Sequence, residues 1–296
     1  MDSLVSVIIT TYCRPVQMLM RALSSARNQT YENLEIIVVD DSPATFAQRE
    51  AVQEAIQSLQ DNRVVYLRHE KNMGACVARN TGIAAAKGQY IMYLDDDDEL
   101  LPENIERRLC VFAENPDLGM VYSRSYIIDT VKGIQQETNQ ELRSGHIFDS
   151  LICNNFIGAF PLIKAECFTT CGMFDPSFQS AQDYDMWLRI AAKYKVGYVD
   201  APLSKVYLHN GERISTNYSK KVQGLEALNE KFLDYLQQHR KTYALRILKL
   251  VKFYALAGDK KTAWKKLAQS IKLNPFITVE QPHLFLGSIY SIICRR

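Results

Sequence analysis

Residues 88–102 read GQYIMYLDDDDELLP and place four consecutive aspartates directly after an apolar segment. Gly88 suits the end of a helix, residues 90–94 predict a buried strand, and Pro102 suits the first position of a following helix. The aspartates therefore occupy the turn that leaves a strand. A strand that passes through a polar turn into a helix is the repeating unit of α/β proteins, so this stretch indicates the fold class.

Four adjacent carboxylates need a counter-charge or full hydration, because unit charges about 4 Å apart repel by about 4 kcal/mol at an effective dielectric near 20. Carboxylate oxygens suit hard divalent cations, which enzymes commonly share with substrate phosphates. The turn therefore predicts a site for Mn²⁺ or Mg²⁺. A solvated acidic turn, followed by a helix whose first carboxylates favour its dipole, is the alternative.

The segments before residue 88 repeat the alternation of strand and helix. Short apolar or β-branched runs at 4–10, 35–39, 64–67 and 90–94 are separated by helical patterns at about 15–28, 44–60 and 74–87. This order predicts a mostly parallel sheet flanked by helices, and right-handed crossovers bring the carboxyl ends of its strands to one edge. Ligands of open α/β sheets bind at that edge.

The turns expected at that edge carry groups that complement a nucleotide. Thr11 and Tyr12 offer a hydroxyl and an aromatic face, and Asp41 offers an acceptor for a base N–H or a ribose hydroxyl. Arg79 lies near the start of a helix, where a cation suits a diphosphate. Each residue also has a structural interpretation as a turn, a cap or an exposed side chain. Complementary groups on four turns at one edge favour the nucleotide site.

Length and composition fit one sizeable α/β domain with an appendage, since the chain has 296 residues of which 47% are hydrophobic. Disordered and fibrous classes are excluded. No basic segment precedes the first apolar run, and the apolar run at 284–294 is too short to span a bilayer, so we expect neither a signal peptide nor a membrane span. The seven cysteines form no Cys-x-x-Cys pair, which predicts reduced thiols and a cytoplasmic protein.

Charge is distributed unevenly, although the formal net charge is only +2. From residue 220 onward 15 Lys and Arg stand against 5 Asp and Glu, which leaves 20 against 28 for residues 1–219. The segment from about Tyr218 is predicted to be helical, and residues 254–275 resemble one tetratricopeptide-like helix pair. We therefore expect a domain at 1–217, with halves at 1–125 and 126–217, and a basic helical region at 218–296.

The basic region suits either a set of solvated helix faces or an anionic partner. Its closing segment, 284–296, is apolar and ends in two arginines. Such a segment is typical of a helix that lies at a membrane surface, or of one that docks on the protein. Peripheral contact of the basic helices with the inner face of a membrane is thus one of the open alternatives, and we expect no nucleic acid partner.

Five segments carry a combined signature. They are VSVIITTYCRP at 5–15, EIIVVDDS at 35–42, NMGACVARNTG at 72–82, the acidic stretch at 88–102, and GMFDPSFQSAQDYDMWLR at 172–189. Together, over about residues 4–215, they resemble the ordered segments of the family 2 glycosyltransferases. The resemblance implies the GT-A fold, a nucleotide-diphosphate sugar as donor, with UDP as the first expectation, and inversion of the anomeric centre.

The resemblance also assigns roles around the donor. It places Tyr12 and Asp41 at the base and Arg79 at the base or the diphosphate. Thr11, from the same turn as Tyr12, is a further candidate for binding the nucleotide sugar.

The acidic run resembles the Asp-x-Asp element of the family. The match implies that Asp95 contacts ribose, the metal or metal-bound water, and that Asp97 binds the metal. Asp96, at the nucleotide sugar, and Asp98 are plausible helpers, because four adjacent aspartates leave the register open.

Asp183 matches the second position of the family's Glu-Asp pair, where the catalytic base lies, although the residue before it is Gln182. A neutral Gln cannot accept a proton or raise a neighbouring pKa through like-charge repulsion, so Asp183 alone is assigned as base. His209, after a predicted strand, resembles a position that some relatives place near the diphosphate or metal. Cys13, where Asn is common, is a second departure from the family pattern.

These assignments predict a metal-dependent inverting glycosyltransferase of hexosyl or N-acetylhexosaminyl type. Its acceptor would be a hydroxyl of a glycan, lipid-linked or protein acceptor, in surface polysaccharide or glycoconjugate assembly. A sugar-1-phosphate nucleotidyltransferase shares the sheet type, but it needs a glycine-rich basic loop where residues 10–15 contain no glycine. A catalytically weak pseudo-glycosyltransferase acting as a scaffold is disfavoured by the retention of Asp97 and Asp183.

Overall fold

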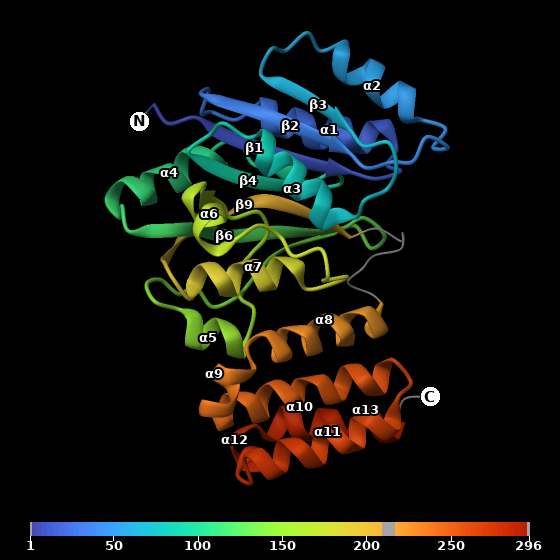
Figure 1. The fold of residues 1–296 in the computed structure, drawn as a ribbon, viewed down its shortest axis with the longest axis vertical. Helices are drawn as coiled ribbons and strands as arrows, with labels where there is room; N and C mark the ends of the chain where they lie inside the picture. Colours follow the sequence, from blue (N-terminus) through green and yellow to red (C-terminus); the bar gives the residue numbers. More distant parts are fainter. Residues whose placement is uncertain (1, 209–216, 295–296) are drawn as a thin grey trace. The chain divides into compact units, whose positions relative to one another are not determined.

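The computed structural model describes residues 2–208 and 217–294 (Figure 1). Its internal contacts divide the chain into two compact units. The first, here called the sheet unit, comprises Met1–Leu151, Asn155–Pro176 and Met186–Asn210. The second, here called the helical unit, comprises Ile152–Asn154, Ser177–Asp185 and Gly211–Arg296. Two internal segments therefore group with the C-terminal helices, which a division by sequence position alone does not anticipate.

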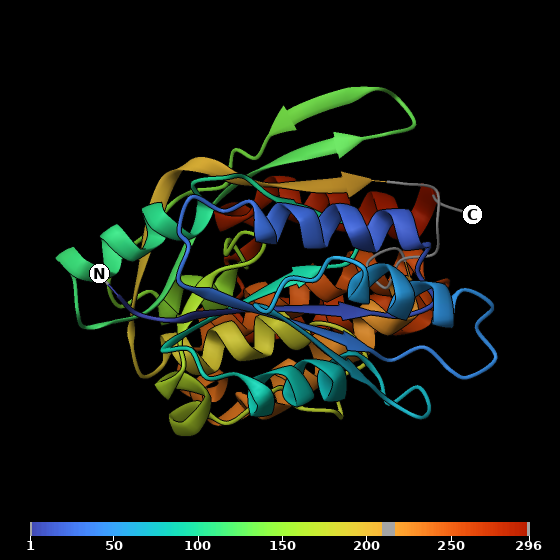
Figure 2. The ribbon, with the colours of Figure 1, turned by 90° about the horizontal axis from the view of Figure 1, so that it is seen from above.

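The predicted alternation of strands and helices in the first hundred residues is confirmed. The elements are β1 (Val5–Thr11), α1 (Val16–Arg27), β2 (Leu34–Asp40), α2 (Arg49–Gln57), β3 (Val64–Arg68), α3 (Ala75–Ala85) and β4 (Tyr90–Asp95). β1 pairs in parallel with β2 and β4, and β2 pairs in parallel with β3. Figure 2 shows α1 and α3 on opposite faces of these strands. The carboxyl ends of the four strands consequently share one edge.

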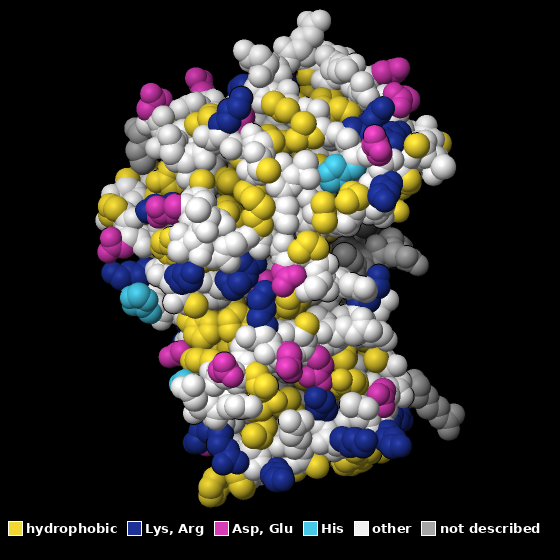
Figure 3. Space-filling view, in the orientation of Figure 1, with side chains coloured by type: hydrophobic (Ala, Val, Ile, Leu, Met, Phe, Trp, Pro, Cys, Tyr) yellow, Lys and Arg dark blue, Asp and Glu magenta, His cyan; other side chains and the backbone are white. Residues whose placement is uncertain are grey.

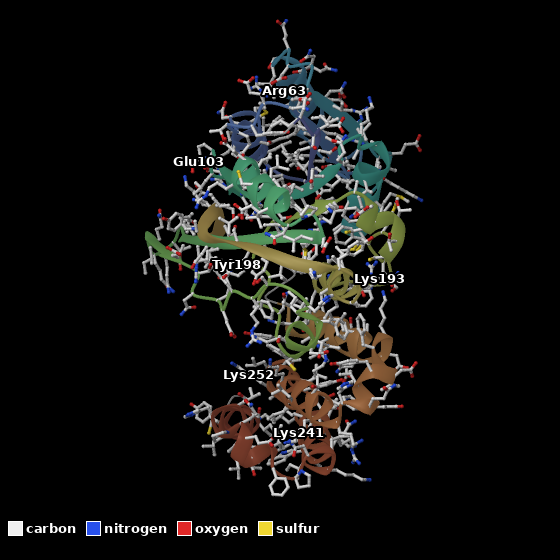
Figure 4. The ribbon with its side chains drawn as sticks, turned by 90° about the vertical axis from the view of Figure 1, so that its left-hand side faces the viewer. Arg63, Glu103, Lys193, Tyr198, Lys241 and Lys252 are labelled. Atoms are coloured by element: carbon white, nitrogen blue, oxygen red, sulfur yellow. The ribbon has the colours of Figure 1, made fainter. Side chains whose placement is uncertain are left out.

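Within the described residues the sheet has nine strands in the order β3-β2-β1-β4-β8-β6-β9-β5, with β7 paired to β6. The further elements are β5 (Glu99–Leu100), α4 (Asn104–Glu114), β6 (Leu118–Asp129), β7 (Ile134–Glu137), α5 (Phe148–Cys153), β8 (Leu162–Lys164), α6 (Glu166–Cys171), α7 (Gln182–Ala191) and β9 (Lys195–Leu208). β8 is antiparallel to β4 and β6, whereas β6 and β9 run in parallel. Figure 4 shows these two long strands side by side, with Tyr198 on β9.

The helix after the four aspartates begins later than predicted. Pro102 is expected at its first position, but α4 begins at Asn104 with Glu103 as the N-cap residue. Glu99 and Leu100 instead form β5, which pairs with β9. The carbonyl of Pro102 accepts a hydrogen bond from the N–H of Thr30 at 2.9 Å, so this residue pairs outside the helix.

The C-terminal region is helical from Tyr218, as predicted. Its helices are α8 (Tyr218–Lys231), α9 (Leu233–Gln238), α10 (Arg240–Leu256), α11 (Lys260–Leu273), α12 (Ile277–Glu280) and α13 (Pro282–Cys294). Gly258, with φ of 87°, separates α10 from α11, and the side chain of Asp259 caps α11 by accepting a hydrogen bond from the N–H of Thr262. No helix in 2–208 or 217–294 combines the length and apolar character that a bilayer crossing requires.

Gly82 allows α3 to approach β1 closely. A Cβ atom at Gly82 would lie 2.4 Å from Cγ2 of Ile8, whose side chain is fully buried. We therefore expect Gly82→Ala to lower the free energy of unfolding by about 1–3 kcal/mol through overpacking, as measured by urea denaturation. Gly287→Ala in α13 is the matched control, because an added Cβ meets no atom within 4 Å there, and alanine should stabilise that helix by about 0.5–1 kcal/mol. Equal stability of both variants would contradict the close contact.

Candidate functional site

The turns after β1, β2, β3 and β4 meet at the carboxyl edge of the parallel strands, as predicted. The hydroxyl of Thr11 donates to Oδ2 of Asp96 at 2.7 Å and joins the turns after β1 and β4. The N–H of Asp41 donates to the carbonyl of Thr11 at 2.9 Å and joins the turns after β1 and β2. Nδ1 of His69, after β3, lies 2.7 Å from Oδ1 of Asp41.

The four aspartates separate into two buried and two accessible side chains. Asp96 and Asp98 are buried, and Oδ1 of Asp98 accepts a hydrogen bond from the N–H of Tyr207 at 2.8 Å. The side chain of Asp95 is 48% exposed and that of Asp97 is 17% exposed. The two accessible aspartates, Asp95 and Asp97, therefore have the spacing Asp-x-Asp. Because all four residues are aspartates, the sequence alone does not show which two are accessible.

Arg14 supplies a counter-charge to this turn. Its Nε lies 2.8 Å from Oδ1 of Asp96, and its Nη2 lies 3.2 Å from Oδ2 of Asp97. Burial raises the pKa of Asp96 to about 6, and the Arg14 charge and the Thr11 hydrogen bond oppose that rise. Arg14 is not among the predicted site residues, although its position directly after the first strand is a signal for it.

Arg79 lies in α3 beside the acidic turn. Its Nη2 is 3.4 Å from Oδ1 of Asp95, and its guanidinium carbon is 5.2 Å from the centre of the Phe174 ring. The side-chain amide of Asn80 donates to the carbonyl of Phe174 at 2.8 Å and accepts from its N–H at 2.9 Å. These contacts tie the segment at Phe174 to the helix that carries Arg79.

Asp41 and Tyr12 differ strongly in exposure. Asp41 is buried, and its carboxylate accepts hydrogen bonds from the N–H groups of Met73 and Gly74 at 2.7 and 2.8 Å in addition to its contact with His69. It therefore helps to order the start of α3. Tyr12 is 51% exposed, so its ring is accessible to a flat partner. His69 directly follows β3 and contacts Asp41, although it is not among the predicted site residues.

The acidic turn fits a divalent cation in a shared site. Among the described residues, no three His, Cys, Asp or Glu side chains converge so that they could hold a metal by themselves. Enzymes commonly bind Mg²⁺ through one or two carboxylates together with substrate phosphates. The accessible carboxylates of Asp95 and Asp97 match that arrangement.

Asp183 lies in the first turn of α7, as predicted, and groups with the helical unit. Trp187 on the same helix is buried in the core. The predicted His209 lies outside the described residues.

The hydrogen bond from Thr11 to Asp96 leads to a prediction for stability. We expect Thr11→Val to lower the free energy of unfolding by about 1.5–3 kcal/mol at neutral pH, because the hydroxyl donates to a buried ionised carboxylate. Urea denaturation measures the change. Thr30→Val is the control, since the Thr30 hydroxyl donates to the exposed Glu106.

The sign of the pH dependence follows from the raised pKa of Asp96, about 6 against about 3.9 in an unfolded chain. The Asp96 carboxyl itself stabilises the fold fully below about pH 4, and this contribution is lost as the pH rises through about 6. Thr11 stabilises the ionised form, so its contribution is largest above about pH 6 and shrinks below it. A Thr11→Val effect that grows as the pH falls would contradict this assignment.

Comparison with known proteins relates the chain to enzymes of one family. The family model described as "Glycosyl transferase family 2" matches residues 6–177. The putative colanic acid biosynthesis glycosyl transferase WcaA of Escherichia coli (strain K12) is 30% identical over 274 residues, which cover 90% of this chain and 92% of that protein. An uncharacterized glycosyltransferase of Methanocaldococcus jannaschii, MJ1057, is 29% identical over 223 residues, or 74% of each chain.

Solved structures show a related fold. The crystal structure of S. aureus TarS matches with a TM-score of 0.67 at 14% identity, over 97% of this chain and 54% of that chain. This chain thus spans about half the length of TarS. A structure of TarS 1-349 in complex with UDP-GlcNAc matches with a TM-score of 0.62 at 16% identity, over 97% of this chain and 81% of that one. The sheet unit accordingly has the GT-A type of α/β fold that the sequence predicts.

Proposed function

The chain belongs to glycosyl transferase family 2 and is a glycosyltransferase, and from this premise we propose that it transfers a sugar from a UDP-sugar with inversion of the anomeric centre. The observation that carries the proposal is the convergence of four turns at the sheet edge, with the accessible carboxylates of Asp95 and Asp97 at its acidic corner.

The donor is proposed to lie along this edge. The exposed Tyr12 ring would stack on the base, and the Arg79 guanidinium would bind the diphosphate. Asp41 supports the base-binding turn through its contacts with the start of α3. The complex of the structural relative TarS 1-349 with UDP-GlcNAc supports UDP-GlcNAc as the first donor to test.

We propose that Asp97, together with Asp95, would hold Mn²⁺ or Mg²⁺ beside the donor diphosphate. When bound, such a cation supplies Lewis-acid stabilisation of the charge that develops on the departing diphosphate. Arg14 holds Asp96 and Asp97 in place, and its charge keeps the carboxylates from repelling one another before the donor arrives.

Asp183 is proposed as the general base. It would take the proton of the acceptor hydroxyl as that oxygen bonds to the anomeric carbon and the bond from this carbon to the diphosphate oxygen breaks. A positioned base contributes roughly 10²–10⁴ in rate. Attack from the face opposite the diphosphate inverts the anomeric centre. The similarity to the colanic acid enzyme supports an acceptor in surface polysaccharide assembly.

The helical unit presents groups that suit an anionic membrane surface. Leu286, Tyr290 and Ile293 of α13 are 59–63% exposed and recur at the spacing of one helix face. Residues 260–294 contain five lysines and one glutamate, and Trp264 among them is also exposed. Figure 3 shows Lys, Arg and hydrophobic side chains gathered over the region of α11. We propose that these helices contact anionic lipid at the inner membrane face, where a lipid-linked acceptor would lie.

Sedimentation with vesicles tests the membrane contact. The protein should bind vesicles of phosphatidylcholine mixed with phosphatidylglycerol, but not vesicles of phosphatidylcholine alone, and should dissociate between about 0.1 M and about 1 M salt. Replacing Leu286, Tyr290 and Ile293 by Gln should abolish binding, whereas Ile134→Gln, at an exposed position on β7, should not. Binding that survives the triple replacement, or that needs no anionic lipid, would refute the contact.

A melting-temperature panel tests the donor. UDP-GlcNAc, GDP-mannose and a dTDP-sugar are compared with and without Mn²⁺. A ligand that binds only the native state at about one hundred times its Kd stabilises it by about 2.7 kcal/mol, so UDP-GlcNAc with Mn²⁺ should give the largest increase. The donor proposal fails if no UDP-sugar raises the melting temperature in the presence of metal.

A further inference from the structure

The C-terminal helices hold the segment that carries Asp183. Residues Ser177–Asp185 group with these helices, and contacts reach the segment on both sides of Asp183. Two residues after it, Asp185 is fully buried, and its Oδ1 lies 2.8 Å from Nζ of Lys231 at the end of α8. The same ammonium group lies 5.1 Å from the centre of the Phe178 ring. Lys231 therefore contacts the segment at both Phe178 and Asp185.

Arg246 of α10 makes a second link. Its Nη1 donates to the hydroxyl of Tyr184 at 3.2 Å and to the carbonyl of Ile152 at 2.5 Å, and the Tyr184 hydroxyl donates to the same carbonyl at 3.1 Å. Its Nε donates to Oδ1 of Asn229 on α8. Arg246, Tyr184 and Asn229 are all buried. Because hydrogen bonds are stronger in a buried network, these contacts restrain the side chain of Tyr184, the residue next to Asp183.

Before Asp183, the backbone of α8 packs directly on Ser180. The Ser180 hydroxyl donates to the carbonyl of Lys220 at 2.7 Å. A Cβ atom at Gly224 would lie 2.4 Å from the carbonyl oxygen of Ser180. Ala181, which follows, has φ of 61°, in the left-handed region that non-glycine residues rarely adopt. Such a conformation persists only where surrounding contacts impose it.

We propose that α8 and α10 fix the position of Asp183, and that Lys231 and Arg246 are positioning residues for it. The proposal rests on the role of Asp183 as base. A base must lie within about 3 Å of the hydroxyl proton it takes, and a misplacement of about 1 Å can cost about 10²-fold in rate. Lys231 also neutralises Asp185, whose buried charge would otherwise act on Asp183 two residues away.

The release of UDP from UDP-GlcNAc, with water as acceptor, tests the proposal in the full-length protein. Gly224→Ala and Lys231→Met should each lower kcat by about 10- to 100-fold, with KM for UDP-GlcNAc unchanged within about twofold. Lys231→Arg should restore most of kcat because it returns the charge. Lys241→Met is the matched control, since Lys241 pairs with Glu280 at 2.6 Å on the exposed side of α10 and should leave kcat unchanged.

Hydrogen exchange at the amides of residues 177–185 provides a readout that does not depend on turnover. Exchange there should become faster in Gly224→Ala and Lys231→Met, and stay unchanged in β4. Wild-type kcat in either folded variant would overturn the proposal, as would a loss that appears mainly in KM. If the wild-type protein binds no UDP-sugar, the proposed donor is wrong. Hydrogen exchange would still test whether Gly224 and Lys231 hold residues 177–185 in place.

Discussion

Asp97→Asn is expected to lower the turnover of UDP-GlcNAc by at least about 10³-fold, which corresponds to several kcal/mol of lost transition-state stabilisation. Asn keeps the shape of the side chain but removes the charge that a divalent cation needs. Asp97 is the proposed metal ligand, and its side chain is accessible beside the buried Asp96. Steady-state release of UDP measures the loss.

A second readout separates the metal from the fold. In the wild-type protein, Mn²⁺ should increase the rise in melting temperature that UDP-GlcNAc causes, and in Asp97→Asn this increase should disappear. Asp117→Asn is the matched control, because Asp117 is an exposed aspartate that pairs with Lys195 at 3.3 Å. An Asp97→Asn protein that keeps both its turnover and its response to Mn²⁺ would exclude Asp97 as a ligand.

Asp183→Asn is expected to lower turnover by about 10²–10⁴-fold while UDP-GlcNAc binds as in the wild type. The amide has the same size as the carboxylate but cannot take the acceptor proton. Gln182 cannot replace it, because a neutral side chain has no basic oxygen of comparable strength. Turnover and the melting temperature with UDP-GlcNAc and Mn²⁺ are the two measurements.

Asp234→Asn serves as the control for Asp183→Asn, since Asp234 also lies in the first turn of a helix of the helical unit, α9. It should retain wild-type turnover. If the Asp183→Asn protein retains it too, another group takes the proton. If the wild-type protein binds UDP-GlcNAc but neither transfers nor hydrolyses it, the scaffold alternative gains support.

The strands whose carboxyl ends meet at the site were predictable, because their local sequence pattern favours the same structure as the tertiary fold. Val5–Thr11 and Tyr90–Asp95 are apolar runs that end in polar turns, and both strands form as expected. The start of α4 was not predictable, because the carbonyl of Pro102 accepts a hydrogen bond from the N–H of Thr30, far earlier in the chain. Pro102 is compatible with either arrangement, so local preference could not decide between them.

The register of the acidic turn and its partners depends on tertiary structure. Four identical residues give no sequence signal for which side chains are buried, and the contacts from Thr11 and Arg14 single out Asp96. The same reasoning explains why the Asp185–Lys231 pair was missed. Asp185 lies in the predicted domain at 1–217 and Lys231 in the predicted helical region at 218–296. Only the tertiary structure shows that these two residues are in contact.

Isothermal titration of UDP-GlcNAc into the wild-type protein, with Mn²⁺ and after its removal by a chelator, measures whether donor binding at the acidic turn depends on the metal. Binding should be at least about tenfold tighter with Mn²⁺, a difference of about 1.4 kcal/mol, because the cation would interact with both the acidic turn and the diphosphate. Equal affinity with and without the metal, or no binding in either case, would contradict the proposal.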